Sequence, residues 1–577
     1  MKRTKVCLAL ILASIVLLSA RPGPARPDRP AGRGGALALV RIPKTATLPL
    51  GTLVRLGIDV RQDLATCLLA LADRDDMTML RRSGIRFSVL DRNAPRPEYL
   101  LVETGLPGAL DSLRAAGRAV AVEAGTAVFW TERGSAAAEV PAGLPSKVLP
   151  ARSVLPYLRS RPAAAAAAPV AAVQDPLVES IVSLVSSSSL AADVQTLQDL
   201  QTRYASTTNC ESAGDSLYAS FSALGLDDVH FESFTFSSGY TSRNVVAEKT
   251  GESFPGDFYI ICAHYDSTSP SATRQTLAPG ADDNASGAAA VLGAARALAG
   301  YPLDYSVRFV AFSAEEWGLW GSRAYADAAR ARGERILGVI NLDMIAYANA
   351  VPEDLQIIVN DSSAWLADLF AIAGAQYGVV TTARMIDPSI IYSDHSPFWD
   401  NGYPALLAIE DYPLNNPYYH QTTDTLDRLN LDFFTAAARG ATGLLAGLAQ
   451  PIRDGYPAAP ARLTAAWETY RSLFNTLAAV NLEWDAQADA AGYNVYRTTT
   501  SHLGYVKVND EPIVGTSFSD TGAVSGGEYY YVLTAVGPTG LESNRSRENA
   551  WRSAAAVPAA AASSGRTIRP AGPRGIR

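Results

Sequence analysis

Histidines and carboxylates come together in five short segments of this 577-residue chain. Two of its five histidines, His264 and His420, lie in these segments beside acidic residues. The segments comprise residues 263–266, 280–284, 314–318, 341–344 and 419–424. Imidazole nitrogens and carboxylate oxygens are the ligands that hold Zn²⁺ in catalytic sites. Because two such ions roughly 3.5–4 Å apart can bind and activate one water molecule, the segments predict a two-metal site with hydrolytic chemistry.

His264 and Asp266 follow an apolar run, residues 258–263, that is typical of a buried strand. Their i, i+2 spacing places both side chains on one face of an extended segment. A carboxylate near a ligating histidine can orient the ring and raise its basicity. We therefore predict that His264 is a metal ligand and that Asp266 is its orienting partner.

Acidic pairs occur in two of the segments. Asp283 belongs to a cluster that precedes a helix rich in small residues, and its two oxygens could bridge two ions. Taken alone, an acidic cluster there is better explained as a helix cap. Glu315 and Glu316 follow an apolar run and repel each other, so a nearby cation would explain the pair. One would bind metal and the other would act on water as a general base; in isolation, both could be surface residues.

The last two segments each supply one candidate ligand. Asp343 ends the apolar run 336–342, which is an unusual place for a merely solvated charge. His420 lies in an aromatic and polar loop in which Asp424 is available to orient it. Alone, His420 is better explained as a surface residue. The five segments together, in this order, form a much stronger pattern than any one of them.

The five segments can form one site only if a folded domain brings them together. The pattern of residues 176–452 predicts such a domain. Near-continuous apolar runs occur at 257–263, 307–312, 336–342, 355–359 and 405–409. Such runs fit strands that are buried on both faces. Helical patterns lie between them at 287–299, 321–332 and 364–377. The alternation predicts a three-layer α/β domain with a mostly parallel sheet, whose strand ends carry the charged segments, as is usual in open α/β sheets.

A smaller α+β domain is predicted ahead of this scaffold, over residues 36–132. Strand and helix patterns alternate there in a ferredoxin-like order, and no catalytic cluster occurs among them. It is either an accessory module or a pro-region that is later removed. Residues 161–174 form an alanine- and proline-rich linker that would separate it from the scaffold.

A β-sandwich is predicted after the scaffold, over residues 460–549. Apolar or alternating runs at 480–484, 492–497 and 529–536 are separated by turn residues, which is typical of short sandwich strands. This stretch resembles a fibronectin type III domain. The tail, residues 554–577, is rich in Ala, Ser, Pro and Arg and is predicted to be disordered.

The N-terminal residues indicate the localisation of the protein. Residues 1–20 have a basic start and then a short apolar run, which is typical of a cleaved secretory signal. The run is shorter than a membrane span of about 20 residues, so we expect no stable span after its removal; an uncleaved anchor is the alternative. The protein is therefore expected to be secreted, either extracellular or periplasmic.

Charge and cysteine content set two further bounds. The net charge is −8 without a basic stripe, which argues against nucleic acid as a partner. Three cysteines, Cys67, Cys210 and Cys262, follow the signal, so at most one internal disulfide can form. Cys262 lies inside an apolar run and is expected to be a small buried core residue.

The five segments in this order resemble the M28 family of zinc peptidases, of which secreted bacterial leucyl-type aminopeptidases are typical. The resemblance covers roughly residues 199–447 and includes flanking segments at 202–205, 244–248, 318–322 and 392–397. It implies two zinc ions per chain. Asp283 would bridge both ions, His264 and Asp343 would complete one site, and Glu316 and His420 would complete the other.

The resemblance also implies roles outside the ligand set. Glu315 would be the general base, and Asp266 would orient His264. A cis peptide bond is implied between Asp283 and Asn284. Some family members use a tyrosine to assist the reaction, and here Tyr392 and Tyr419 are both candidates.

The implied activity is that of an aminopeptidase acting on peptides with a free N-terminus, whose α-amine would lie near the second metal and local carboxylates. Three related activities are the alternatives: dipeptidase, carboxypeptidase and a glutaminyl cyclase-like acyl transfer. The first two need a cation for the substrate carboxylate, for which Arg384 is a candidate. Cyclase relatives use a single zinc, so the complete ligand set argues against that activity.

Two alternatives belong to other classes. One is a non-catalytic carbohydrate- or surface-binding protein whose working part is the sandwich, and the complete ligand set argues against it. Even in an enzyme, the sandwich could contact a cell surface or a polymer. The other is a regulator of another protease that acts through the N-terminal module.

The remaining histidines have weaker functional signals. His395 follows Ser393 and Asp394 directly, which suggests a serine triad, but residues so close in sequence rarely converge on one atom as a triad requires. We predict that this segment forms pocket wall or supports the ligands. His230 and His502 have no clustered partners and are expected to be ordinary surface or core residues.

Overall fold

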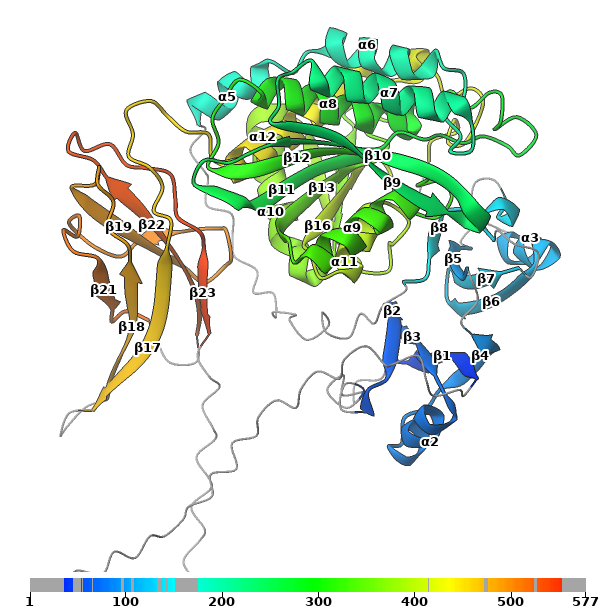
Figure 1. Ribbon diagram of the computed structural model, residues 1–577, viewed down its shortest axis with the longest axis horizontal. Helices are drawn as coiled ribbons and strands as arrows, with labels where there is room; N and C mark the ends of the chain where they lie inside the picture. The colour runs from blue at the N-terminus through cyan, green and yellow to red at the C-terminus, as the bar shows by residue number, and fades with distance from the viewer. Residues whose placement is uncertain are drawn as a thin grey trace, which may run out of the picture.

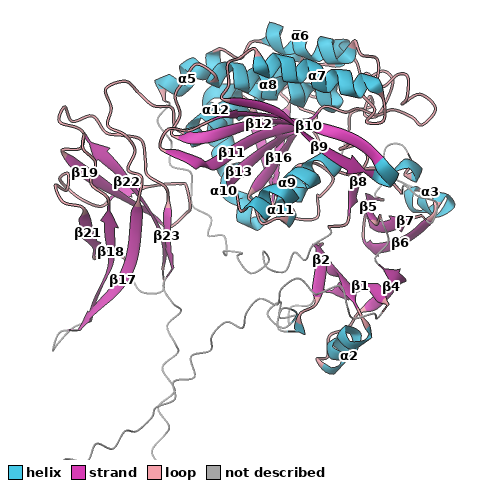
Figure 2. Cartoon of the chain, in the orientation of Figure 1, coloured by secondary structure: helices cyan, strands magenta, loops and turns pink. Residues whose placement is uncertain are grey.

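The computed structural model describes most of the chain between residues 36 and 552 (Figures 1 and 2). The described residues are 36–44, 53, 56–64, 66–94, 98–104, 108–131, 136–141, 144–150, 175–412, 415–471, 476–523 and 527–552. The predicted signal, linker and tail lie outside them. Within these ranges, no single helix is long and apolar enough to cross a membrane, and one bent pair, Pro176–Ser183 with Ser187–Gln198, meets that test by length and composition only.

An eight-stranded sheet forms the centre of the molecule, in the order β15-β14-β16-β13-β11-β12-β10-β9. Its strands are β9 (Asp228–Phe236), β10 (Tyr240–Lys249), β11 (Phe254–His264), β12 (Tyr305–Phe312), β13 (Arg335–Leu342), β14 (Asp354–Val359), β15 (Thr381–Ile386) and β16 (Ala405–Ile409). Each of the five predicted apolar runs lies in one of these strands.

The sheet is mixed, and four of its seven strand pairs are parallel, so the expected mostly parallel sheet holds by a small margin. The central strands β16, β13, β11 and β12 run parallel, and so do β14 and β15. The pairs β9–β10, β10–β12 and β14–β16 are antiparallel. The short turn Ser237–Gly239 joins β9 to β10, and strands joined by so short a turn must be antiparallel.

Helices cover both faces of the sheet (Figure 2). One face packs against α8 (Gly287–Leu298) and α12 (Leu431–Ala449), with α10 (Ala364–Ala373) in the same hydrophobic core. On the same face α7 (Thr208–Ser222) packs directly against β10 and β9, whereas α5 (Pro176–Ser183) and α6 (Ser187–Gln198) lie outside α8 and α12. The other face packs against α9 (Trp320–Arg332) and α11 (His395–Asp400). These two cores hold the strand ends that carry the predicted ligands.

The N-terminal region contains two four-stranded sheets, not the single sheet of a ferredoxin-like order. The first has the order β2-β3-β1-β4 and the second β6-β7-β5-β8. Their elements are β1 (Leu37–Pro43), β2 (Asp59–Asp63), β3 (Cys67–Ala72), α2 (Arg74–Arg82), β4 (Ser88–Ala94), β5 (Leu100–Glu103), α3 (Ala109–Ala116), β6 (Arg118–Glu123), β7 (Thr126–Trp130) and β8 (Ser146–Val148). The pattern analysis did not identify β1, β2 or β8, and with them each half of the region completes its own sheet.

Strand β8 joins this N-terminal module to the central domain. The Val148 amide donates to the Gly318 carbonyl at 3.2 Å. Lys147 forms an ion pair with Asp400 of α11 at 2.6 Å, and its side chain is fully buried. Gly318 has φ +103°, and a Cβ atom there would lie 3.1 Å from the Val148 side chain. The module is therefore packed tightly against the loop that follows Glu315 and Glu316.

The C-terminal region forms two sheets, as the turn-rich pattern predicted. The orders are β17-β18-β21 and β20-β19-β22-β23. The strands are β17 (Leu463–Arg471), β18 (Thr476–Trp484), β19 (Gly492–Thr498), β20 (Val506–Lys507), β21 (Ser517–Asp520), β22 (Glu528–Val536) and β23 (Asn549–Arg552). Their shared core includes Val480, Val495 and Leu533. Arg547 ties this region to β11 through an ion pair with Asp257 at 2.5 Å.

Candidate metal centre

The central sheet delivers the predicted ligands to one edge. His264 is the last residue of β11, Asp343 follows β13 directly, and Glu315 lies three residues beyond β12. These three strands are parallel neighbours, so their carboxyl ends meet. Asp283 lies in the helical turn Ala281–Ser286 that leads into α8, and His420 lies in the loop after β16.

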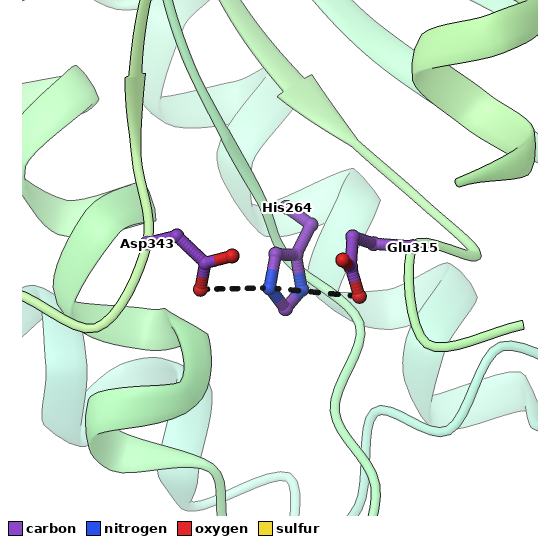
Figure 3. A group of neighbouring side chains, drawn as sticks. All are labelled: His264, Glu315 and Asp343. Atoms are coloured by element: carbon purple, nitrogen blue, oxygen red, sulfur yellow. Dashed lines mark hydrogen bonds and ion pairs between the residues drawn. The ribbon is translucent and has the colours of Figure 1, made fainter. Parts of the chain in front are cut away.

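Two groups of three ligand-type side chains form at this edge, and they are the groups found among the described residues. The first contains His264, Glu315 and Asp343 (Figure 3). His264 Nε2 lies 3.4 Å from Asp343 Oδ1 and 4.0 Å from Glu315 Oε2. The imidazole thus stands between the two carboxylates, and all three offer ligand atoms to one point.

The second group contains Asp283, Glu316 and His420. His420 Nε2 lies 2.9 Å from Glu316 Oε2 and 3.1 Å from Asp283 Oδ2. The other oxygen of Asp283, Oδ1, lies 3.4 Å from His264 Nε2 in the first group. Asp283 therefore presents one oxygen to each group, which is the geometry of a bridging carboxylate. The implied cis peptide bond between Asp283 and Asn284 is present.

Several carboxylates are buried together at this site, so their negative charges need nearby positive charge to be stable. Burial and the Glu316 and Asp343 carboxylates raise the pKa of Glu315 well above its usual value, against the opposing effect of His264. Burial likewise raises the pKa of Glu316 to about 7. Burial opposes the charged form of His420 too, yet Glu316 and Asp283 raise its pKa to about 10. Protons alone satisfy this cluster poorly, whereas divalent cations would satisfy it directly.

The donor set fits zinc. Imidazole nitrogens and carboxylate oxygens are its common ligands in catalytic sites. Glu316 Oε1 and His420 Nδ1 are buried without a hydrogen-bond partner among the described residues. Unpartnered buried polar atoms are costly, and an ion that used both carboxylate oxygens of Glu316 would satisfy Oε1, whereas Nδ1 of His420 is the ring nitrogen that does not face Glu316.

Asp266 contacts His264, as predicted, and also supports the two glutamates. Its carboxylate accepts hydrogen bonds from the amides of Glu315 and Glu316, at 3.1 and 3.3 Å. The closest atom to His264 Nδ1 is the Asp266 carbonyl oxygen at 3.1 Å, while the carboxylate lies 3.6 Å away. Asp266 therefore contacts the imidazole through its carbonyl and its carboxylate, and the carboxylate also positions the glutamate pair.

Asp424 does not orient His420, which corrects the prediction. Its carboxylate accepts from the amides of Asp282 and Asp283, at 2.9 and 3.0 Å. The cause is local: the Asp424 amide donates to the Gln421 carbonyl in a tight turn, and Asp424 is thereby brought against residues 281–283. It fixes the backbone of the proposed bridging ligand instead.

Two further residues support the ligands: Ser393 lies in the segment that was predicted to support them, whereas the sequence analysis did not assign Glu410. Ser393 donates to Asp343 Oδ2 at 2.5 Å and accepts from the Asn341 amide group at 2.7 Å. Glu410 is 1% exposed and accepts from Asn416 at 3.1 Å. Glu410 directly follows β16, so the signal that identified Asp343, an acidic residue after an apolar run, could have found it.

Other residues singled out from the sequence lie away from the ligands. His395 is buried against Trp399, its Nε2 lies 2.9 Å from the Ile390 carbonyl, and burial lowers its pKa to about 3. Arg384 forms an ion pair with Asp368 at 2.6 Å on the edge strand β15, and it does not line the cavities at the ligands.

The remaining histidines and the cysteines also have structural surroundings. His230 forms an ion pair with Asp228 at the surface, as expected. His502 packs against Trp365 of α10, so it lies between domains. Cys67, Cys210 and Cys262 are buried free thiols.

Two small cavities adjoin the ligands, and the N-terminal module lines both. One, of about 40 Å³, is bordered by Glu103 and Pro145 together with the ligand residues. The other, of about 50 Å³, is bordered by Leu144 and Pro145 of the module and by Arg274. The Tyr412 hydroxyl holds Glu103 Oε1 at 3.0 Å. A substrate pocket usually has about 300–1,000 Å³, so the module leaves no room for a peptide.

Comparison with known proteins agrees with the site geometry. The family model described as Peptidase family M28 matches residues 244–444. That range includes every residue predicted for the site. A probable leucine aminopeptidase of Arthroderma otae is 28% identical over 287 residues, which are 47% of this chain and 75% of the relative. A probable aminopeptidase of Saccharomyces cerevisiae is 32% identical over 197 residues, which are 33% of this chain and 52% of that relative.

The chain also has similar solved structures. The LapA aminopeptidase of Legionella pneumophila is one of them, at 17% sequence identity and a TM-score of 0.45. That similarity covers 72% of this chain and 99% of LapA.

Proposed function

We propose that this chain is a secreted aminopeptidase that holds two zinc ions and removes N-terminal residues from peptides. The proposal rests on the position of Asp283. One of its oxygens faces His264 and the other faces His420, so each oxygen faces one ligand group. A shared carboxylate between two ligand groups is the arrangement that two-metal hydrolysis needs. The M28 match over the same residues and the aminopeptidase relatives support the peptide substrate. The predicted signal at residues 1–20 supports secretion.

The ligand roles follow from the distances. His264 and Asp343 would hold one ion, Glu316 and His420 would hold the other, and Asp283 has an oxygen toward each; Glu315 lies in the first group as well, and its separate role is implied by the family resemblance. Zinc ions bound there would supply Lewis acidity to a water molecule and to the scissile carbonyl.

Glu315 is the residue that moves the proton. It lines both cavities beside the ligands, and its oxygen is farther from a histidine nitrogen than those of the other carboxylates in its group. In that position it can take a proton from the attacking water and give it to the leaving amine. Asp266 keeps Glu315 in place through the backbone.

A substrate panel with matched blocked peptides tests this function. Purified protein from which the module has been cleaved should release N-terminal residues from unblocked peptides, and a chelator should stop the reaction. The same peptides with acetylated N-termini should be poor substrates, because their α-amine cannot pair with the carboxylates. Equal cleavage of both sets would favour an endopeptidase, and no cleavage of either would favour a non-catalytic protein.

The N-terminal module acts as a pro-region in this proposal. Its support is the position of Glu103, Leu144 and Pro145 in the cavities at the ligands. Cleavage in the linker, residues 161–174, and loss of the module would then expose the site. Activity of the intact protein and of the linker-cut protein should differ strongly. If secreted, active protein retains residues 36–150 and cutting changes nothing, the module is an accessory domain.

One observation favours a second, narrower candidate function. Arg384, the predicted anchor for a substrate carboxylate, is paired with Asp368 and lies elsewhere. Arg274 instead borders the cavity that contains Glu315, Glu316 and His420. A guanidinium there could pair with the carboxylate of a dipeptide, which would make the enzyme a dipeptidase. Cleavage of dipeptides far in excess of their C-terminal amides would support that activity over a general aminopeptidase.

A further inference from the structure

A larger cavity lies far from the ligands, between the central domain and the C-terminal sheets. Its volume is about 370 Å³, and residues of α5, α10, α12, β11, β12 and the C-terminal region border it. Tyr259 of β11 lines it five residues before His264. Five residues of strand span about 16 Å, so this cavity is separate from the metal centre. In Figure 1 the C-terminal sheets stand beside α5 and the strand ends at this side.

One wall of the cavity is apolar. Leu369, Ile372 and Ala373 of α10 and Leu444 and Leu448 of α12 form it. Gly447 of α12 also borders the cavity, and a Cβ atom there would meet nothing within 4 Å. The space beside α12 is thus open, with a surface suited to an apolar or aromatic body.

The opposite wall is polar, and two of its groups lack partners. Tyr259 is 4% exposed, yet its hydroxyl makes no hydrogen bond to the described residues. A hydroxyl that borders the cavity without a protein partner can donate a hydrogen bond to a ligand there. Arg545 lies over the Tyr505 ring, 4.9 Å from its centroid. Its side chain is exposed at the rim of the cavity and has no acidic partner within the part of the chain that the structure describes.

The other charged groups of the cavity are already paired. Arg453 forms an ion pair with Asp175 and a hydrogen bond with Asn544. Glu548 accepts hydrogen bonds from the Tyr505 hydroxyl and the His502 amide. Arg545 is therefore the cation that remains for a ligand. A guanidinium recognises a planar carboxylate especially well because it can donate two parallel hydrogen bonds.

We propose that this cavity binds a small organic carboxylate with an apolar or aromatic body. The carboxylate pairs with Arg545, the body lies against α10 and α12, and Tyr259 donates a hydrogen bond to the ligand. Its volume falls in the range of about 300–1,000 Å³ that is usual for small-molecule sites, which often lie between domains. Because the cavity is bordered by both domains, the ligand would also strengthen their contact.

Ligand-observed NMR on the full-length protein tests the proposal without any measurement of activity. The probe is 4-phenylbutyrate, with 4-phenylbutan-1-ol as the uncharged analogue and acetate as the analogue without an apolar body. We expect saturable binding of 4-phenylbutyrate, and binding at least tenfold weaker for either analogue, since a tenfold change corresponds to about 1.4 kcal/mol. Binding should also raise the melting temperature.

Two variants assign the binding to this cavity. Gly447→Leu should fill the space beside α12, and Arg545→Gln should remove the charge; each should weaken probe binding at least tenfold. Arg462→Gln, at an arginine that is 69% exposed elsewhere in the C-terminal region, is the matched control and should bind normally. Melting curves check that each variant is folded. Absence of saturable binding, or binding that both cavity variants leave unchanged, would overturn the proposal.

Discussion

The two adjacent glutamates differ in what surrounds them. Glu316 Oε2 lies 2.9 Å from the nitrogen of His420, whereas Glu315 Oε2 lies 4.0 Å from that of His264. Glu315 lines both cavities at the site, and Glu316 lines one of them. From this difference we infer that Glu316 is a metal ligand and that Glu315 transfers the proton.

Substitution separates these roles. Glu315→Gln should retain both metals but reduce kcat by about 10²–10⁴-fold, because the amide cannot accept the proton. Glu316→Gln should instead lower the affinity for one ion. Metal content and kcat, measured on both variants, check this. If the two phenotypes were exchanged, the assignment within the pair would be wrong.

Asp424 offers a second test among single residues. It accepts from two adjacent amides, those of Asp282 and Asp283. The Asp424→Asn variant has only one side-chain oxygen, so one of the two amides loses its hydrogen-bond acceptor. The carboxylate of Asp283 should then be less precisely positioned. Loss of such a supporting contact typically lowers metal affinity about 10–100-fold. Asp427→Asn, at a fully exposed carboxylate in the same loop, is the control. Equal zinc affinity in the two variants, measured by competition with a chelator, would contradict the role of Asp424.

Among the elements, strand β8 connects the N-terminal module to the central domain through several polar contacts. Its Lys147 is fully buried against Asp400, and Arg323 of α9 donates to the carbonyls of Val148 and Leu149. Lys147→Met would leave Asp400 buried without its ion-pair partner, which costs about 3–5 kcal/mol when a buried pair is broken. Weaker docking should then raise the peptidase activity of the uncut chain.

The control for this prediction is Arg114→Met in α3, whose arginine is half-exposed and distant from α11. Both variants are assayed as uncut protein, with mass spectrometry to show that the linker is intact. A Lys147→Met protein that is folded but no more active than the control would show that β8 does not hold the module over the site.

Secondary-structure elements and ligand residues could be predicted from the sequence where neighbouring residues alone determine them. An apolar run followed by an acidic residue identified the end of β13 and Asp343, and the same rule would have found Glu410. The hydrogen-bond partner of a supporting carboxylate could not be predicted in this way. Asp424 is four residues from His420, yet a turn directs it to the backbone of Asp283. The position of β8 was also out of reach, because it depends on a contact with Gly318 that is 170 residues away.

At the scale of the whole molecule, the C-terminal sheets are attached at the end of the central sheet opposite the ligands. Arg547 pairs with Asp257, which is 1% exposed, and Asn544 donates to Asp304 at 2.6 Å. Deletion of residues after 455 should leave hydrolysis of small peptides by module-free protein nearly unchanged, because the site is distant. The melting temperature should fall, because Asp257 and Tyr259 become exposed. A stable, zinc-loaded truncation that cannot cleave short peptides would contradict this.

The central claim is that the molecule holds two zinc ions at the shared carboxylate of Asp283. Elemental analysis of zinc-saturated, module-free protein, combined with activity during stepwise chelation, tests it most directly. The account predicts two ions per chain, with activity lost as they are removed. In Asp283→Ala it predicts weak binding of both ions, whereas Asp343→Ala should mainly affect one. A single tightly bound ion with full activity would contradict the two-metal centre.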